Sequence, residues 1–269
     1  MSKVMRPFDW SFPPRPVQRE VLSRLPDDAD PALPPLLFVH GARHAAWCFE
    51  PWMDLAAARG FSSYAVSLRG HGASGGGERV RRALLRDYVH DVIQAAVRLP
   101  RQPVLVGHSL GALVVERALG RYPARGAALL CPAPLDNGLA ATIKRLRDRP
   151  ADVLETLIGR PLPMRHESLF VGLTPAESAP HLARLGAEST AALYQLTLPH
   201  QPVPTSVPVL VAGTPDDAIV PESDVAKTAR FYGVEPRWFP GLGHDVMLDE
   251  GNEKVLDELL DWVAAEVAR

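Results

Sequence analysis

Cysteine is scarce in this chain of 269 residues, which contains only Cys48 and Cys131. The two lie far apart in sequence, so the C-x-x-C pairs typical of zinc and redox sites are missing. Both stand among apolar residues, which favours buried free thiols in a reducing compartment. We therefore expect a cytoplasmic protein with no metal at these positions.

Long apolar runs and an excess of one charge are also missing. No stretch approaches the roughly 18 continuous apolar residues of a transmembrane helix, and the N-terminal stretch lacks the apolar core of a signal peptide. The chain carries 29 basic and 31 acidic side chains, a formal net charge of -2. Neither a membrane span nor a nucleic-acid partner is expected. The basic clusters within 79–86 and 144–149 are interpreted as solvated helix faces.

What the chain does contain is hydrophobic residues, 46% of the total, enough for one large domain with a buried core. Short apolar segments alternate with segments of helical spacing, and this alternation predicts a mostly parallel sheet sandwiched by helices, an α/β fold. Strands are expected at 35–41, 61–72, 103–107, 126–134, 207–213 and 236–241, with a weaker candidate at 17–22. Helices are expected at 47–59, 84–99, 110–122, 223–232 and 255–267.

The interval 135–204 differs, because its apolar spacing is helical and it holds no strong strand. A structureless loop of that length is uncommon within a compact domain. We therefore expect an α/β core from 1–134 and 205–269, with 135–204 inserted as a helical cap. Leu169, Phe170 and Tyr194 are candidates to line an apolar substrate pocket under this cap, although packing within the cap explains them equally well.

The stretch "LVGHSLGAL" (Leu105–Leu113) places Ser109 between two glycines, at the junction of an expected strand and an expected helix. By itself, G-x-S-x-G occurs by chance in about one chain in ten of this length. A sharp strand-to-helix turn, however, presents a serine above the sheet, and the small neighbours Gly107 and Gly111 tolerate its backbone angles. Ser109 is therefore the candidate nucleophile, with a helix N-cap as the alternative interpretation.

A serine nucleophile needs a base, and the base needs an orienting acid. His244 lies in the loop "PGLGHDVMLDE" after the last expected strand, where the base of such a sheet belongs. The segment "GTPDDAIVP" offers two adjacent carboxylates after the preceding strand. Asp217 is the preferred acid from its spacing to "IVP". Asp216 is the alternative, and Asp136 is a third candidate.

Acyl transfer also requires two N–H donors for the developing oxyanion. One is expected at Leu110, directly after the nucleophile. The other is expected in the loop after the first parallel strand, at Ala42, with Arg43 as the weaker choice. His40 and His44 have i,i+4 spacing in this loop, but a third ligand is not evident, so no metal or other cofactor is expected.

Four separated stretches resemble one family: "LLFVHGARHAAWCFEPW", "SLRGHGASGG", "PVLVGHSLGALVV" and "VPVLVAGTPDDAIVP…PGLGHDVMLD". The chain resembles the α/β-hydrolase superfamily, especially its small serine esterases and lysophospholipase-like members. "HGA" followed by H-x-A-W also resembles the plant methylesterase and hydroxynitrile-lyase branch. The resemblance implies Ser109, Asp217 and His244 as the triad, with Ala42 and Leu110 as oxyanion donors.

The chain also departs from relatives at several positions. Ser67 stands where many carry an aspartate, which affects the anchoring of the following loop. The N-terminal hairpin common in the family is poorly marked. The serine argues against dehalogenase and epoxide-hydrolase relatives, which use an aspartate nucleophile. Asp245 replaces the lysine that follows the catalytic histidine in plant hydroxynitrile lyases.

These features predict a serine hydrolase that cleaves a carboxylic ester, or a thioester or amide, in a small molecule with an apolar moiety. A second hypothesis uses the same triad for C–C bond hydrolysis, a lyase reaction or cofactor-free oxygenation, since such reactions share one scaffold. A third, a non-catalytic ligand-binding protein, is disfavoured because every triad position holds a competent residue.

Overall fold

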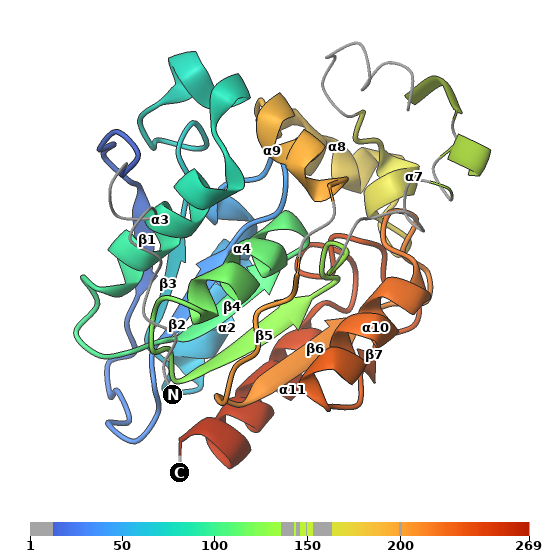
Figure 1. The fold of residues 1–269 in the computed structure, drawn as a ribbon. Coiled ribbons are helices and arrows are strands. Elements are labelled where there is room, and N and C mark those ends of the chain that lie inside the picture. The colour runs from blue at the N-terminus through green and yellow to red at the C-terminus, as the bar shows by residue number, and fades with distance from the viewer. Residues whose placement is uncertain are drawn as a thin grey trace.

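The computed structural model describes residues 13–135, 143, 146–148, 150–152, 163–198 and 201–268. These residues form a seven-stranded sheet of order β1-β3-β2-β4-β5-β6-β7 (Figure 1). Only β1 is antiparallel to its neighbour, and all other neighbouring pairs are parallel. The strands are β1 (Val21–Arg24), β2 (Leu36–Val39), β3 (Ser63–Val66), β4 (Val104–His108), β5 (Gly126–Leu130), β6 (Val209–Gly213) and β7 (Arg237–Trp238).

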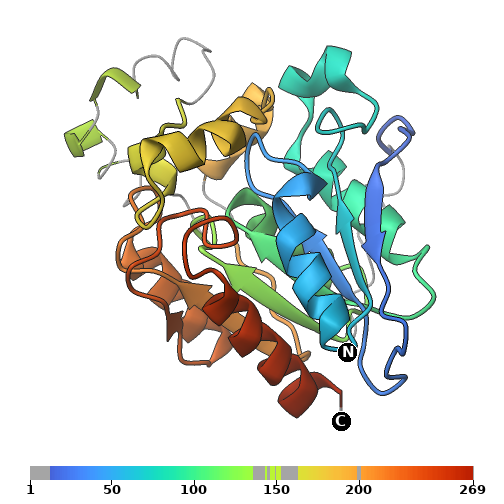
Figure 2. The same cartoon turned by 180° about the vertical axis from the view of Figure 1, so that it is seen from behind.

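Helices cover both faces of this sheet. The face seen in Figure 2 packs against α2 (Glu50–Ala58) and α11 (Glu253–Trp262), and the opposite face against α3 (Leu85–Ala96), α4 (Leu110–Leu119) and α10 (Glu222–Tyr232). Successive residues of a strand point to opposite faces. Accordingly, Leu36 and Phe38 belong to the core under α2 and α11, whereas Leu37 and Val39 belong to the core under α3 and α4. Both faces are buried, which is why the strands read as continuous apolar runs.

Several segments differ from the sequence expectation. The strands expected at 61–72, 126–134 and 236–241 are shorter, as β3, β5 and β7 show. The N-terminal strand is shifted, since β1 begins at Val21 and the candidate at 17–22 overlaps it by two residues. The helix expected at 47–59 is divided into the 3₁₀ turn η1 (Ala46–Phe49) and α2, whose first turn contains Pro51. Proline lacks the N–H that would continue the preceding turn. The last helix ends as a π turn, η3 (Val263–Val267).

The interval between β5 and β6 contains α7 (His166–Leu169), α8 (Pro175–Ala183) and α9 (Thr190–Leu196). These helices lie over the carboxyl ends of the parallel strands (Figure 1). Helix α8 starts with a capping box, in which Thr174 and Glu177 satisfy each other's backbone N–H groups. Within the described part of 135–204 no strand is present.

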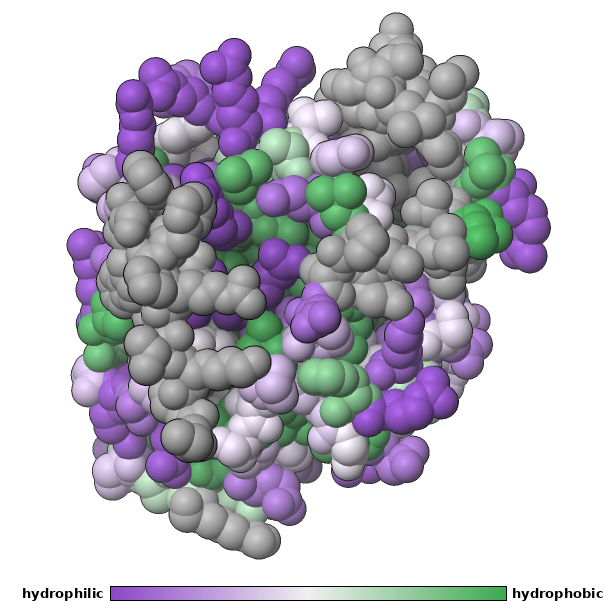
Figure 3. All heavy atoms as spheres, viewed as in Figure 1, coloured by the Kyte–Doolittle hydropathy of each residue, from purple (hydrophilic) through white to green (hydrophobic). Residues whose placement is uncertain are grey.

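The surface of the described residues is mainly polar on the face drawn in Figure 3. Hydrophilic side chains project over η2 (Gly77–Arg82), where Arg79, Arg81 and Arg82 are exposed. Cys48 and Cys131 are both free and buried. A search of the described helices found none with the length and apolar character needed to span a membrane.

Candidate active site

Ser109 lies in the sharp turn between β4 and α4, with φ 53° and ψ -118°. Few non-glycine residues adopt such angles, and those that do need surrounding structure to hold them. Here the Ser109 N–H donates to Leu130 O at 2.9 Å, and the Ser109 carbonyl accepts from Ala133 N at 3.1 Å. The turn also needs glycine on both sides, because a Cβ on Gly107 would lie 2.6 Å from Ala112 Cα and one on Gly111 would lie 2.5 Å from the backbone oxygen of His40.

The structure brings His244 and Asp217 to this serine. His244 Nε2 lies 2.9 Å from Ser109 Oγ, and His244 Nδ1 lies 2.7 Å from Asp217 Oδ2. Because a carboxylate only accepts, Nδ1 carries the proton and Nε2 is left to accept from the serine hydroxyl. His244 and Asp217 are 2% and 5% exposed, so little water competes for these bonds.

The two adjacent carboxylates have separate partners. The second oxygen of Asp217 accepts from Ile219 N at 2.7 Å and Val220 N at 2.8 Å, which fixes the side chain toward His244. Asp216 is exposed and instead accepts from Gly241 N at 2.7 Å. Asp136 lies outside the described residues.

The loop after β2, residues 40–44, is called the Gly41 loop below. A Cβ on Gly41 would lie 2.8 Å from His108 Nδ1 and 3.1 Å from Ser109 Cβ, so glycine lets the loop pass this close to the serine. Leu110 opens α4, and the first N–H groups of a helix have no intrahelical acceptor. The N–H of Arg43 is already donated to Glu188 Oε2 at 2.9 Å. Of the two sequence candidates in this loop, Ala42 is therefore the one compatible with an oxyanion.

Sequence reasoning missed the hydrogen bonds that hold the backbone of His244 and the Gly41 loop. His108 Nε2 donates to the His244 carbonyl at 2.9 Å, and burial, then the nearby His244, lowers the pKa of His108 to about 3, so this ring is neutral. His44 links the Gly41 loop to Asp245, because its Nδ1 lies 3.0 Å from the Ala42 carbonyl oxygen and its Nε2 lies 3.0 Å from Asp245 Oδ2. Burial would raise the pKa of Asp245, but the contact with His44 outweighs it and lowers that pKa.

The hydrogen bonds of His44 and His108 had one signal in the sequence, which is the number of histidines that stand close to glycines. His40 and His44 have i,i+4 spacing, and their ring nitrogens contact protein atoms: His40 Nε2 accepts from Leu68 N at 3.0 Å, and both His44 nitrogens face protein oxygens. The ligand atoms of His108, Cys131 and His244 lie within 4.8 Å of one another. His244 uses both nitrogens on Ser109 and on the acid, so this group is arranged for hydrogen bonding.

The three pocket candidates take different positions. Leu169 and Phe170 are 1% and 4% exposed and pack against the loop that carries His244. Leu169 O accepts from Asp245 N at 3.0 Å, and a Cβ on Gly243 would lie 2.7 Å from Phe170 Cα. Tyr194 is 65% exposed on α9 and does not share this buried position.

Comparison with known proteins finds an alpha/beta hydrolase family model and hydrolase relatives. The family model described as "Alpha/beta hydrolase family" matches residues 36–258. A monoacylglycerol lipase of Mycolicibacterium smegmatis is 27% identical over 250 residues, 86% of this chain and 88% of the relative. Methylesterase 10 of Arabidopsis thaliana is 33% identical over 93 residues, 33% of each chain.

Solved structures show the same fold. The monoglyceride lipase of Saccharomyces cerevisiae, solved as a soluble variant with a substrate analogue, superposes with a TM-score of 0.71 at 13% identity. The match covers 93% of this chain and 92% of the yeast protein.

Proposed function

Because the chain belongs to the alpha/beta hydrolase family, we propose that it is a serine hydrolase that cleaves a carboxylic ester through an acyl-enzyme. The observation that carries this proposal is the hydrogen-bonded chain from Ser109 through His244 to Asp217. Thioesters and amides are second-choice substrates, because they react through the same tetrahedral intermediate.

The reaction uses five residues, and His244 acts in more than one step. Ser109 Oγ attacks the carbonyl carbon while His244 Nε2 takes its proton, and Asp217 stabilises the imidazolium that forms. The negative oxygen of the intermediate is bound by the N–H groups of Ala42 and Leu110. His244 then gives its proton to the leaving alcohol. A water molecule, activated by the same imidazole, hydrolyses the acyl-serine in a second attack.

We infer the substrate class from the interval between β5 and β6 and from the similarity to known proteins. We place residues 135–204 as a cap over the serine, with the buried Leu169 and Phe170 beside the loop of His244. Apolar side chains there favour an apolar acyl group. The similarity to a monoacylglycerol lipase over most of the chain makes monoacylglycerols the first substrates to test.

The test combines a fluorophosphonate probe with p-nitrophenyl esters from acetate to dodecanoate and with monoacylglycerols. Wild-type protein is expected to be labelled and to hydrolyse at least one of these series. Ser109→Ala is expected to lose labelling and to lower kcat by about four to six orders of magnitude. Ser206→Ala, a change of an exposed serine in the loop before β6, is the matched control.

Two results would contradict the proposal. Absence of labelling and of turnover in folded wild-type protein would exclude a serine hydrolase. Labelling at Ser109 without turnover of any ester, thioester or amide would indicate that the triad serves C–C bond hydrolysis, a lyase reaction or oxygenation.

A further inference from the structure

Arg43, the residue after the proposed donor Ala42, is held by residues from the interval between β5 and β6. Its N–H donates to Glu188 Oε2 at 2.9 Å, its carbonyl accepts from Gly186 N at 2.8 Å, and its Nε donates to Gly186 O at 2.8 Å. Arg43 has φ 65°, a left-handed conformation that a non-glycine side chain adopts at a cost. These contacts therefore hold a strained backbone next to Ser109.

Glu188 is anchored at both carboxylate oxygens. One oxygen accepts from Tyr88 OH at 2.7 Å and from Ser189 N at 2.6 Å, and the other lies 3.3 Å from His71 Nε2. Only 7% of Glu188 is exposed. Burial alone would raise its pKa, but His71, Tyr88 and Ser189 outweigh burial and lower the pKa to about 2. The side chain is therefore a fixed carboxylate with no oxygen left for a substrate.

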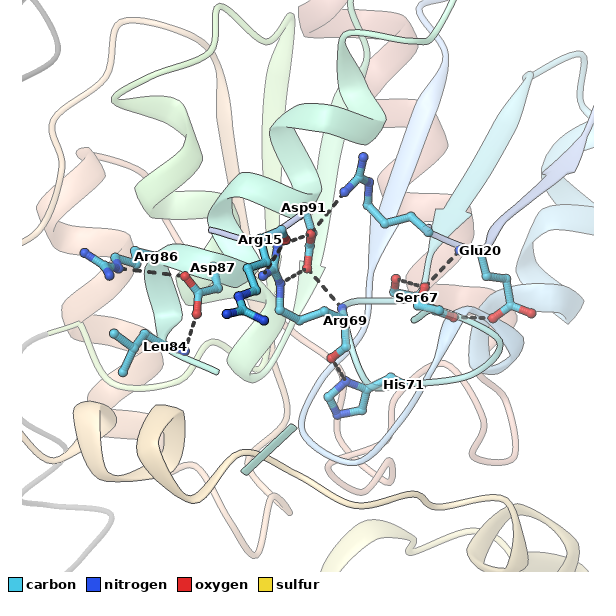
Figure 4. Close-up of polar contacts among 11 residues, drawn as sticks. Arg15, Glu20, Ser67, Arg69, His71, Leu84, Arg86, Asp87 and Asp91 are labelled. Carbon is cyan, nitrogen blue, oxygen red and sulfur yellow. Dashed lines mark hydrogen bonds and ion pairs between the residues drawn. The ribbon is translucent and has the colours of Figure 1, made fainter. Parts of the chain in front are cut away.

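His71, the partner of Glu188 in the ion pair, is itself held in place. His71 Nδ1 faces the Arg69 carbonyl at 3.1 Å, and Arg69 forms two side-chain bonds of 2.8 Å to Asp91 on α3 (Figure 4). Both ring nitrogens of His71 thus face oxygen atoms that only accept. Nδ1 is within hydrogen-bond distance of the Arg69 carbonyl, whereas Nε2 forms an ion pair with Glu188 without a hydrogen bond. Burial opposes a positive charge on this ring, but Glu188 outweighs it and raises the pKa of His71. A buried ion pair anchors the Gly41 loop to the frame of the fold.

The peptide group between Ala42 and Arg43, whose N–H donates to Glu188, is held at its carbonyl as well. The Ala42 carbonyl, in one plane with the Arg43 N–H, accepts from His44 Nδ1 at 3.0 Å. Asp245 holds the other nitrogen of His44. With Glu188 on the N–H and His44 on the carbonyl, the plane between Ala42 and Arg43 cannot rotate, and this fixes ψ of Ala42.

The neighbouring peptide group carries the N–H of Ala42. Its carbonyl, from Gly41, accepts from His40 Nδ1 at 2.8 Å and from His44 N at 3.3 Å. In a planar trans peptide the N–H points away from the carbonyl, so these bonds turn the Ala42 N–H to the opposite side. Its final direction depends on both planes, which meet at Ala42 Cα.

We propose that Glu188 is a positioning residue for ester hydrolysis, which aims the oxyanion donor at Ala42 by holding the Arg43 N–H. The oxyanion site is then complete only while residues 186–189 are docked on the Gly41 loop. This inference rests on the proposed function, because it needs an oxyanion to be stabilised. Donors of this kind act through preorganisation, so a small loss of aim lowers kcat while leaving ground-state binding unchanged.

The experiment compares Glu188→Gln with wild type and with Glu177→Gln, the same substitution at an exposed capping position of α8. Glutamine keeps the size of Glu188 but loses the charge opposite His71 and replaces one acceptor with a donor. In E188Q we expect kcat for the best ester substrate to fall about tenfold to a hundredfold with KM within about twofold. The affinity for a trifluoromethyl ketone, whose tetrahedral adduct occupies the oxyanion site, is expected to fall in parallel with kcat. E177Q is expected to match wild type.

Failure of the proposed function and failure of the role of Glu188 give different results. An inactive wild type contradicts the proposed function, whereas an active wild type with an equally active E188Q overturns only the role of Glu188. A loss in E188Q confined to KM also overturns it. If E188Q does not fold, the variant Tyr88→Phe tests the role of Glu188 instead. This substitution removes one hydrogen bond to Glu188 and leaves the Gly41 loop untouched. A lowered kcat in Y88F at unchanged KM supports the proposal, and an unchanged kcat overturns it.

Discussion

Three non-glycine residues in the described chain have a positive φ: Arg43, Ser109 and Cys131. All three follow the carboxyl ends of parallel strands, β2, β4 and β5, and Cys131 Sγ lies within 4.8 Å of ligand atoms of His108 and His244. Strained backbone persists only where surrounding contacts hold it, and it gathers at functional sites. Its confinement to this one edge of the sheet supports the candidate site independently of the side-chain chemistry.

At the residue scale, the choice between Asp217 and Asp216 can be tested by removing one charge at a time. Asp217→Asn is expected to lower kcat about 10³- to 10⁴-fold, because an amide at this position no longer favours the tautomer in which His244 Nδ1 carries the proton. Steady-state kinetics with the best ester substrate measures the effect.

Asp216→Asn is the matched comparison. Its carboxylate accepts from Gly241 N and is exposed, so kcat is expected to stay within about twofold of wild type. Equal losses in the two variants, or a larger loss in D216N, would show that the acid is assigned to the wrong carboxylate.

At the element scale, the order of strands and helices could be predicted because short apolar strands and amphipathic helices are local patterns. The positions of Ser109, Asp217 and His244 could also be predicted, since each follows a strand end and parallel strands end at one edge. Glu188 could not. It lies 145 residues from Arg43 in an interval of helical spacing, and its contact to the Gly41 loop arises only from tertiary folding.

The antiparallel strand β1 also brings in a carboxylate that the sequence did not reveal. The family resemblance implies an aspartate at position 67, where this chain has Ser67, and Glu20 supplies a carboxylate at this place. Glu20 Oε2 accepts from Ser67 Oγ at 2.5 Å (Figure 4). Glu20 Oε2 also accepts from Ala73 N at 3.1 Å, and Ser67 Oγ accepts from Ala46 N at 2.9 Å. Glu20 thus anchors the loop after β3 through Ser67 and Ala73.

This exchange predicts a coupling between Glu20 and Ser67. Ser67→Asp alone is expected to destabilise the protein by about 1–3 kcal/mol, because two carboxylates then share one buried position. In Ser67→Asp with Glu20→Gln, one charge remains and the amide can donate to it, so most of the loss is expected to be recovered. Urea unfolding of the wild type, both single variants and the double variant measures this interaction free energy. Additive losses would contradict the exchange.

At the scale of the whole molecule, the site lies where the strand order reverses. The chain passes from β2 outward to β3 and then returns to the other side of β2 as β4. Connections after β2 and β4 therefore separate at the carboxyl edge, where open α/β sheets place their ligands. The Gly41 loop and Ser109 follow these two strands, and the interval after β5 supplies Glu188 from above. The fold thereby brings together residues that lie between positions 43 and 244 of the chain.

The buried polar groups outside the site give the stability of the whole molecule a pH dependence that can be predicted. Glu116 on α4 is 1% exposed; one of its oxygens accepts from Val203 N, and the other has no partner among the described residues. Burial raises the pKa of this carboxyl from 4.5 to about 7. The folded state therefore retains a proton that the unfolded state has lost between about pH 4.5 and 7. In this window stability falls as pH rises.

Comparison with Glu116→Gln isolates this carboxyl from every other titrating group, since glutamine keeps the oxygen that accepts from Val203 N but does not ionise. We expect the two proteins to have similar stability near pH 4.5. By pH 8 the wild type should be the less stable by about 2–3 kcal/mol, because each pKa unit corresponds to about 1.4 kcal/mol. Thermal melts across this range measure the difference, and about 2–4 °C per kcal/mol is expected for a chain of this size. Melting temperatures that change in parallel with pH would show that Glu116 does not keep its proton in the folded protein.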